Sequence, residues 1–222
     1  MQFPDARILI FSRVPRVGQV KTRLIPLLGE QGACDFHRVC LKNALQRMLD
    51  SDLAPVELWL DSDPQDVSGL PSARGEGFRV RVQPQGDLGQ RMAHAVAAGP
   101  AGEAPTILIG TDVPLLDAAY IEAALARLAR GDDIVMGPAE DGGYVLLGLC
   151  RPYPELFEDI PWGTDRVAAL TRERCQRAGL TLDELPILWD VDRPQDIRRL
   201  CAETGEGLEA LQARVCQHLP RL

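Results

Sequence analysis

Four basic side chains gather in one short segment near the start of this chain. Arg13, Arg16, Lys21 and Arg23 lie within eleven residues, directly after the apolar run that begins at Ile8. The whole chain carries a formal net charge of −8, so general basicity does not explain this local excess. Cations at the carboxyl end of a first strand are suited to neutralise a di- or triphosphate and the charge on a leaving group. A solvated loop whose charges favour solubility is the alternative.

The other residues of this basic loop favour close approach of a ligand. Gly18 permits backbone conformations that other residues rarely adopt, and Pro15 stiffens the chain. The glycine and lysine spacing of a Walker A loop is absent. We therefore predict a nucleotide site of a different kind, with Lys21 and Arg23 as its catalytic cations. Its nucleotide-contacting residues in this loop would be Arg13, Gly18, Lys21 and Arg23.

Three carboxylates follow apolar runs that have the composition of buried strands. Asp112 ends the run from Thr106, and Asp190 and Asp192 follow the run from Leu185. Side chains two apart on an extended chain share a face, so Asp190 and Asp192 repel each other unless a cation lies between them. Mg²⁺ needs only one or two carboxylates when substrate phosphates complete its shell. The three residues therefore predict a metal site at the edge of the sheet.

Other roles for these carboxylates stay open. Asp112 also suits a turn. One carboxylate of the later pair would cap a helix that begins at Pro194, although Arg193, directly before Pro194, cannot act as such a cap. Asp61 and Asp63 form a further Asp-x-Asp pattern after an apolar run, and spacing alone does not distinguish them from the later pair.

A glycine-rich segment opens a predicted helix in the middle of the chain. Gly86, Asp87 and Gly89 lie where the first free N–H groups of that helix would face an anion or the edge of a base. We predict that these three residues also contact the nucleotide. A plain turn before the helix is the alternative.

A second glycine turn leads into a later strand and predicts an acceptor site. Gly142 and Gly143 would let a ligand approach the backbone closely, and Asp141 stands directly before them. Trp162 would line the same pocket. The alternatives are a plain turn for the glycines and ordinary packing for the tryptophan.

The histidines and cysteines show no pattern typical of a catalytic or metal site. The three histidines fall in helical segments without a triad partner, so no chemistry is assigned to them. No two cysteines form a C-x-x-C pair, and we expect buried free thiols rather than a disulfide framework or a structural metal. These residues are His37, His94 and His218, and Cys34, Cys40, Cys150, Cys175, Cys201 and Cys216.

Strand and helix patterns alternate along the whole chain. Strands are expected at 6–12, 56–61, 78–83, 106–111, 134–136, 144–149 and 185–191, and helices at 30–50, 87–98, 117–130, 164–178, 194–204 and 207–218. The run at 78–83 alternates as an edge strand does, and 63–77 is a surface excursion. The order predicts an α/β fold: one domain over residues 1–222, with a mostly parallel mixed sheet between two helical layers.

The overall composition excludes several classes of protein. With 222 residues, 45% hydrophobic and 25% charged, the chain is typical of a globular enzyme. The acidic balance argues against a nucleic-acid polymer as partner. No apolar run reaches the ~18 residues of a membrane span, and the N-terminus lacks a secretory pattern, so we expect a cytoplasmic protein.

Five segments, in order along the chain, resemble the nucleotide-diphospho-sugar transferase superfamily, which has the GT-A fold. They are residues 11–24, 86–92, 110–115, 141–148 and 189–196. Within the superfamily the chain is most similar to the bacterial glycosyltransferase-like family associated with radical-SAM/selenodomain proteins. It also resembles molybdenum-cofactor and phospholactate guanylyltransferases.

This resemblance implies roles for the charged residues. Lys21 and Arg23 would bind phosphates, while Asp112, Asp190 and Asp192 would hold Mg²⁺ or Mn²⁺. Asp61 and Asp63 would then belong to a surface turn. The sequence departs from the family pattern Asp-Val-Asp-Thr-Pro, because Arg193 replaces the threonine. The loop also lacks the Gly-x-Gly of larger sugar nucleotidyltransferases, so base recognition is not carried over.

The leading hypothesis is an Mg²⁺-dependent nucleotidyltransferase. A small anionic acceptor would attack the α-phosphorus of a nucleoside triphosphate and release pyrophosphate. The first alternative is a glycosyltransferase that uses a nucleoside-diphosphate sugar, with Asp141 or Glu140 as base for an acceptor hydroxyl. The second is a non-catalytic nucleotide-binding protein on the same fold. The expected partners are thus a nucleotide or sugar-nucleotide donor and a small-molecule acceptor, and the oligomeric state is left open.

Overall fold

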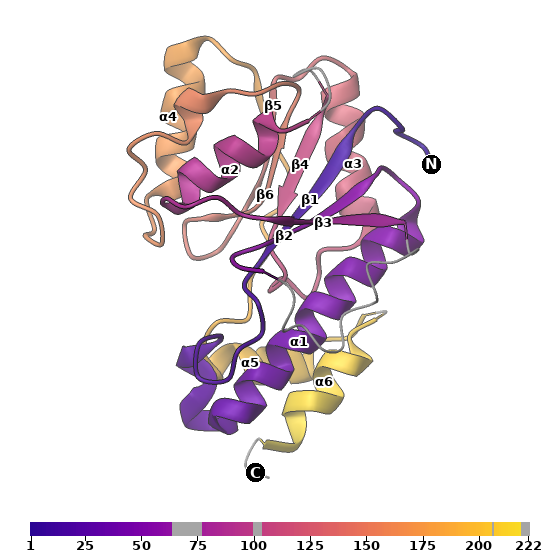
Figure 1. Ribbon diagram of the computed structural model, residues 1–222, viewed down its shortest axis with the longest axis vertical. Coiled ribbons are helices and arrows are strands. Elements are labelled where there is room, and N and C mark those ends of the chain that lie inside the picture. Colours follow the sequence, from indigo (N-terminus) through magenta and orange to yellow (C-terminus); the bar gives the residue numbers. More distant parts are fainter. Residues whose placement is uncertain (64–76, 100–103, 206, 219–222) are drawn as a thin grey trace.

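The computed structural model describes residues 1–63, 77–99, 104–205 and 207–218 (Figure 1). The strands are β1 Arg7–Ser12, β2 Val56–Leu60, β3 Phe78–Val82, β4 Thr106–Ile109, β5 Ile134–Pro138, β6 Tyr144–Leu149 and β7 Leu182–Glu184. The helices are α1 Ile25–Ser51, α2 Leu88–Ala97, α3 Ala118–Ala129, α4 Val167–Ala178, α5 Pro194–Ala202 and α6 Glu209–Val215. Short 3₁₀ turns cover Thr22–Leu24, Pro154–Leu156 and Cys216–His218. Most of the expected surface excursion at 63–77 lies outside the described residues.

The strands form one sheet in the order β3-β2-β1-β4-β6-β5-β7. Only β6 runs antiparallel to its neighbours β4 and β5, whereas the other paired strands are parallel. The expected mostly parallel mixed sheet is therefore confirmed, and β3 is an edge strand as its alternating pattern predicts. Parallel strands place their carboxyl ends at one edge, which is where α/β proteins bind ligands.

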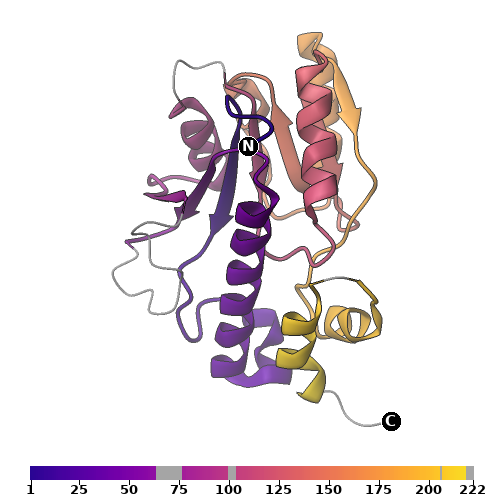
Figure 2. The same ribbon diagram turned by 90° about the vertical axis from the view of Figure 1, so that its right-hand side faces the viewer.

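Helices cover both faces of the sheet because successive side chains of a strand point to opposite sides. Ile8 and Ile10 of β1 pack with residues of α1 and α3, whereas Leu9 packs with residues of α2 and α4. Figure 2 shows α2 and α3 on opposite sides of the sheet. None of the described helices combines the length and the apolar character that a membrane span requires.

A third apolar cluster lies beyond the end of the sheet. Side chains from the N-terminal half of α1, from α5 and from α6 form it, and Trp189 and Val191 are buried among them. Both views show α5 and α6 beside the lower half of α1 (Figures 1 and 2). This cluster anchors the chain on either side of Asp190.

The expected strand at 185–191 is wrong in its position. The strand is β7, at Leu182–Glu184, and the following residues make only one isolated bridge, between Leu188 and Ala139. Pro186 has no N–H to donate, which interrupts a regular ladder. The acidic pair Asp190-Val-Asp192 therefore lies in an irregular segment, not at the end of a strand.

Two cysteines form a disulfide, so the expectation of free thiols is wrong for them. Cys201 of α5 and Cys216 after α6 are bonded, with their Cα atoms 5.7 Å apart. The pairing depends on how α5 and α6 fold back on each other, which spacing does not reveal. The remaining cysteines are free, and Cys34, Cys40 and Cys175 are buried as expected.

Candidate functional site

A cavity of about 820 Å³ opens at the carboxyl ends of β1 and β4. The basic loop, α2, the turn before β6 and the segment before α4 complete its wall. Of the residues predicted from the sequence, the cavity is lined by Arg13, Lys21, Arg23, Asp112, Asp141, Gly143, Trp162 and Asp192. The tertiary structure thus brings the basic loop, two of the three metal candidates and part of the acceptor turn to one space.

Lys21 is engaged with protein groups on both sides. Its Nζ lies 2.8 Å from Asp112 Oδ2 and donates a hydrogen bond to the backbone oxygen of Val191. The side chain is only 4% exposed. Burial acts to lower the pKa of Lys21, but the facing Asp112 outweighs it, so the pKa lies above its usual range. Lys21 thereby keeps its charge and joins two segments that are far apart in sequence.

Asp112 is held in its ionised form by the same contact. Burial acts to raise the pKa of Asp112, but Lys21 outweighs this effect and the pKa is lowered. The hydroxyl of Thr111 donates to Asp112 Oδ1 at 3.0 Å. The backbone N–H of Val191 donates to Asp112 O at 2.9 Å, which pairs the Asp112 segment with the Asp190 segment.

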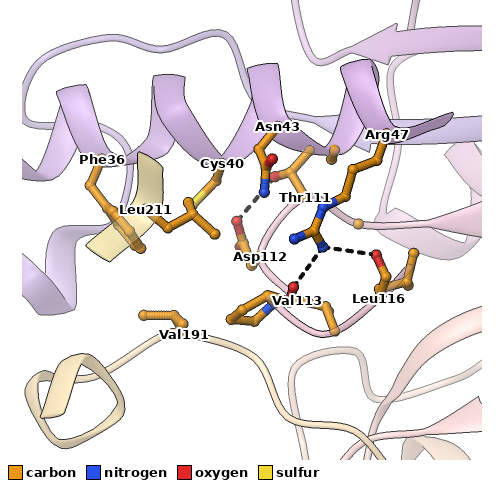
Figure 3. Close-up of a pocket in the computed structure, with 13 residues that line it drawn as sticks. Phe36, Cys40, Asn43, Arg47, Thr111, Asp112, Val113, Leu116, Val191 and Leu211 are labelled. Atoms are coloured by element: carbon orange, nitrogen blue, oxygen red, sulfur yellow. Dashed lines mark hydrogen bonds between the residues drawn. The ribbon is translucent and has the colours of Figure 1, made fainter. Parts of the chain in front are cut away.

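A small pocket behind Asp112 shows how its loop is fixed (Figure 3). Arg47 of α1 donates hydrogen bonds to the backbone oxygens of Pro114 and Leu116 at 2.7 and 3.2 Å. These bonds hold the turn after β4 against α1. Asp112 is therefore positioned from behind by α1 and faces the main cavity in front.

Asp190 lies in a crowded field of negative charge. Burial raises the pKa of Asp190 to about 6, and the nearby carboxylates of Asp141 and Asp112 add to the rise. Lys21 acts in the opposite direction. Asp190 is half-buried and is not among the residues that line the cavity.

Arg23 and Asp192 form an ion pair at the mouth of the cavity. The side chain of Arg23 is 63% exposed, so solvent screens this pair and its contribution to stability is small. The carboxylate of Asp192 is thus engaged by Arg23, whereas the sequence predicts it as the third ligand of a metal ion. Within the described ranges, no three His, Cys, Asp or Glu side chains are grouped as a metal cluster requires.

A side chain in the first turn of α5 binds the backbone that leads into this helix. Asp196 accepts hydrogen bonds from the backbone N–H groups of Arg193 and Asp192 at 2.7 and 3.0 Å. Neither Asp190 nor Asp192 is used as the cap of α5, and Asp196 instead fixes the backbone of the N-cap residue Arg193. Both predicted carboxylates thus keep their side chains for other partners.

The neighbouring carboxylates of Asp112 and Asp190, which we call the acidic centre, have donor chemistry that suits Mg²⁺. Asp112 and Asp190 supply the hard oxygen donors that this ion prefers, and Mg²⁺ commonly completes its shell with substrate phosphates and water. The carboxylates of Asp141 and Asp112 create a negative potential at Asp190, and a bound cation would reduce the repulsion between these groups. The metal role of Asp112, Asp190 and Asp192 itself stays a prediction.

The basic loop is braced by residues to which the sequence assigned no chemistry. Asp61, expected in a surface turn, lines the cavity and accepts a hydrogen bond from Val14 N at 2.8 Å. His37 of α1 is buried at the cavity wall, with Nε2 3.0 Å from the backbone oxygen of Arg13. Burial lowers the pKa of His37, so its neutral form is favoured. Gly18 is not on the cavity wall and faces Glu30.

The glycine segment before α2 has a local structural role. Asp87 caps α2 by accepting from Gln90 N at 2.9 Å, and Gln90 Oε1 accepts from Asp87 N. A Cβ on Gly89 would lie 2.4 Å from Phe157 O, so this glycine allows close packing. Gly86, Asp87 and Gly89 are all absent from the cavity wall, and their contact with a nucleotide stays a prediction.

The turn before β6 separates two neighbouring carboxylates. Glu140 is held by Arg199 of α5 through two hydrogen bonds of 2.6 and 2.9 Å. Asp141 lines the cavity, and its Oδ1 accepts from Gly143 N at 2.9 Å. Gly142 lies against Asp165 O, where a Cβ would come within 2.2 Å. Asp141 is therefore better placed than Glu140 to meet an acceptor.

The wall near α4 is aromatic. Trp162 contacts Tyr144 edge to face, with ring centroids 6.3 Å apart, and both residues line the cavity. Burial raises the pKa of Tyr144 above its usual range, so its hydroxyl stays protonated. This geometry agrees with the predicted position of Trp162 in a pocket.

Gln83 is a candidate binding residue that the sequence did not reveal. Its Nε2 donates to the backbone oxygens of Trp59 and Ser12 at 2.9 and 3.3 Å. Since carbonyl oxygens only accept, these two bonds orient the amide and leave Oε1 as an acceptor at the cavity wall. A lone glutamine after an edge strand carries no sequence signal.

Comparison with known proteins identifies relatives of this fold. A family model described as "Uncharacterized protein conserved in bacteria (DUF2064)" matches residues 44–164, more than half of the chain. No curated protein sequence matches this chain. A Desulfovibrio desulfuricans G20 protein, provisionally described as a nucleotide-diphospho-sugar transferase, is 27% identical, with a TM-score of 0.80 over 97% of this chain and 98% of that chain.

Two more distant solved structures share the fold. A cytidylyltransferase from Leptospira borgpetersenii is 13% identical, with a TM-score of 0.57 over 96% of this chain and 93% of that chain. A 4-diphosphocytidyl-2C-methyl-D-erythritol synthase from Anaerococcus prevotii is 8% identical, with a TM-score of 0.59 over 88% and 94%. At these identities the likeness concerns the fold alone.

Proposed function

Since this chain belongs to the bacterial protein family DUF2064, whose model matches residues 44–164 and with them the part of the cavity wall from Asp61 to Thr164, we propose that it is a nucleotide-dependent transferase that transfers a nucleotidyl group. The resemblance to the nucleotide-diphospho-sugar transferase superfamily, expected from the ordered motifs, is confirmed by the Desulfovibrio relative, and the enzyme class is transferase. The donor would be a nucleoside triphosphate. The acceptor would be a small anion that carries a phosphate or carboxylate.

The observation that carries this proposal is the opposition of charges across one cavity. Arg13, Lys21 and Arg23 line it from the basic loop, and Asp112 and Asp141 line it from the strand ends and turns. A triphosphate has more negative charge to neutralise than a nucleoside-diphosphate sugar, which favours nucleotidyl transfer.

In the proposed reaction the side chains bind and orient the two substrates. An acceptor oxygen attacks the α-phosphorus, the bond to the bridging oxygen of the β-phosphate breaks, and pyrophosphate leaves with the electron pair. Arg13 and Arg23 would stabilise the charge that grows on pyrophosphate. An acceptor that is already ionised has no proton to lose, so this chain need not supply a general base.

Asp112 and Asp190 are the residues that would hold Mg²⁺. When bound, this ion neutralises phosphate charge and fixes the orientation of the donor. Lys21 keeps the two acidic segments together, and Thr111 fixes one oxygen of Asp112. Asp192, paired with Arg23, would position that arginine at the mouth of the cavity.

Glycosyl transfer is the second candidate, and Asp141 is the observation that favours it. This carboxylate lines the cavity and keeps one oxygen beyond its bond to Gly143, so it could accept a proton from an acceptor hydroxyl. Glu140, the other candidate base, is engaged by Arg199.

Product analysis distinguishes the two reactions. The protein would be screened with nucleoside triphosphates and with sugar nucleotides, each with and without Mg²⁺, first by thermal shift because a ligand that binds the native state raises its stability. Stabilising donors would then be incubated with phosphorylated and carboxylated acceptors. We expect pyrophosphate release from a triphosphate. Release of nucleoside diphosphate from sugar nucleotides alone would overturn nucleotidyl transfer, and stabilisation without any turnover would indicate a binding protein.

A further inference from the structure

We propose that Lys21 is the resident counter-cation of the acidic centre, which neutralises Asp112 in the free protein and competes with a divalent metal for it. The proposal rests on the proposed function, in which Asp112 and Asp190 hold the metal. It assigns Lys21 a role different from that of a phosphate ligand. The metal site would therefore be weak until a nucleotide is present.

The contacts of the ammonium group support this role. Nζ lies 2.8 Å from Asp112 Oδ2 and also donates to Val191 O. An ammonium group has three donors, so at most one remains for a substrate phosphate. The Lys21 side chain is 4% exposed and that of Asp112 is 37% exposed, so solvent screens this pair less than it screens a surface ion pair.

The backbone also holds Lys21 in this position. Lys21 has a left-handed conformation, with φ 48° and ψ 40°, directly before the 3₁₀ turn at Thr22–Leu24. This conformation costs energy in a residue other than glycine. The turn is itself fixed, since Leu24 is fully buried and its N–H donates to Lys21 O at 2.8 Å. The ammonium group is therefore directed at the acidic segments by the fold.

The neighbouring carboxylates explain why a built-in cation is needed. The carboxylates of Asp141 and Asp112 both act electrostatically on Asp190, and the backbone N–H of Val191 pairs the Asp190 segment with Asp112 O at 2.9 Å. Without a cation, the paired segments at Asp112 and Val191 would bring these like charges together at a cost. Removal of one partner from a buried ion pair leaves an uncompensated charge, which is strongly destabilising.

Arg23 offers a matched comparison within the same loop. It pairs with Asp192 rather than with Asp112, and its side chain is 63% exposed. Its main partner is Asp192 and Asp190 is a minor one, so its removal should change the charge at Asp112 much less than removal of Lys21 does. The loss of positive charge is the same in Lys21→Met and Arg23→Met, so only the position of the charge differs.

The test measures Mn²⁺ binding in the absence of nucleotide, by calorimetry or by the electron spin resonance of the free ion. We expect Lys21→Met to bind Mn²⁺ at least about tenfold more tightly than the unaltered protein, because the competing cation is gone. Lys21→Arg, which retains the charge, and Arg23→Met should stay within about twofold. Unchanged or weaker binding by Lys21→Met would overturn the proposal, since a phosphate-binding or purely structural lysine predicts that result.

Thermal stability gives a second readout if Lys21→Met folds poorly. Lys21→Gln retains a donor of similar length and serves as the milder variant. Without metal, Lys21→Met and Lys21→Gln should both melt at a lower temperature than the unaltered protein. Mn²⁺ should raise the melting temperature of each variant by more than it raises that of the unaltered protein. The double variant Lys21→Met with Asp112→Asn should recover stability relative to Lys21→Met, because both charges are then absent. Failure of both responses contradicts the proposal.

Failure of the proposed function would look different. If no variant binds Mn²⁺ even with nucleoside triphosphate present, the metal role of Asp112 and Asp190 fails, and the present inference fails with it. If all proteins bind Mn²⁺ equally and pyrophosphate is released, only the role of Lys21 as a competitor is wrong.

Discussion

Most charges at the site are paired with protein groups before any ligand is considered. Lys21 contacts Asp112, Arg23 contacts Asp192, and Glu140 is held by Arg199. These contacts decide which carboxylate can act on a substrate. Asp141 lines the cavity and Glu140 does not, although the two are adjacent in sequence.

Substitution of Asp112 tests the centre of the proposed site. Asp112→Asn removes the charge that faces Lys21 and would hold the metal, so we expect metal-dependent turnover to fall by roughly 10²- to 10³-fold, or about 3–4 kcal/mol in activation free energy. Pyrophosphate release measures the effect. Asp63→Asn changes a carboxylate of the other Asp-x-Asp pattern and should stay within about twofold. Unchanged turnover in Asp112→Asn would remove this residue from the mechanism.

At the scale of secondary structure, polar contacts tie elements together where apolar packing ends. Asp133, directly before β5, accepts from Thr181 N at 2.9 Å and from the Tyr153 hydroxyl at 2.7 Å. These bonds join the start of β5 to the turn before β7 and to the loop after β6. The backbone bond from Thr181 and the hydroxyl of Tyr153 lower the pKa of Asp133.

The Asp133 contacts predict a dependence of stability on acid. A carboxyl group whose pKa is lower in the folded chain stabilises the fold fully above its unfolded pKa of about 3.9, and this stabilisation is lost as the pH falls through the folded pKa. Asp133→Asn should therefore flatten the decline in unfolding free energy below about pH 5. Urea unfolding between pH 3 and 7 measures it. An identical decline in both proteins would show that Asp133 does not contribute.

A buried ion pair fixes α2 to the sheet and predicts a large loss on substitution. Arg7 of β1 contacts Glu57 of β2 at 3.4 Å and donates to Val96 O of α2 at 2.8 Å. Arg7→Met would leave the buried Glu57 with the more distant Arg81, 3.7 Å away, so we expect a cost near the lower end of about 3–5 kcal/mol. Arg7→Met with Glu57→Gln removes both charges and should recover part of the loss. Denaturant unfolding measures both, and equal stability of Arg7→Met and the unaltered chain would contradict the prediction.

At the scale of the whole molecule, the C-terminal segment returns to the N-terminal half of α1. Trp189 and Val191 enter the apolar cluster formed with α5 and α6, which places Asp190 beside Asp112. The same packing brings Cys201 to Cys216. The acidic centre is thus completed by the last quarter of the chain.

The disulfide predicts a loss of stability on reduction. It closes a loop with a sequence separation of 15, for which chain entropy gives about 3 kcal/mol. Dithiothreitol should lower the unfolding free energy by roughly this amount in the unaltered protein. The double variant Cys201→Ser with Cys216→Ser should be less stable from the start and should not respond to the reductant. A protein that unfolds identically with and without reductant would show that the bond adds nothing.

Much of the fold could be predicted because hydrophobic periodicity is local. The buried run at Ile8–Ile10, the long helix that follows and the edge pattern at Phe78–Val82 are all confirmed. The strand expected at 185–191 failed because Pro186 and irregular pairing with β5 decide that segment. The positions of the basic loop and of Asp112 could also be predicted from the sequence. Both follow apolar strands, and parallel strands place their carboxyl ends at the same edge of the sheet.

The sequence by itself determined which residues carry charge, which runs are apolar, and hence the α/β order and the superfamily resemblance. Only the tertiary structure decided which charges meet. Lys21 and Val191 are 170 positions apart, and Arg23 and Asp192 are 169 apart. Such contacts depend on the packing of α5 and α6 against α1 and on β4 lying beside β1, which no local pattern contains. The charge of the basic loop can therefore be predicted from the sequence, whereas the partners of Lys21 and Arg23 are known only from the folded chain.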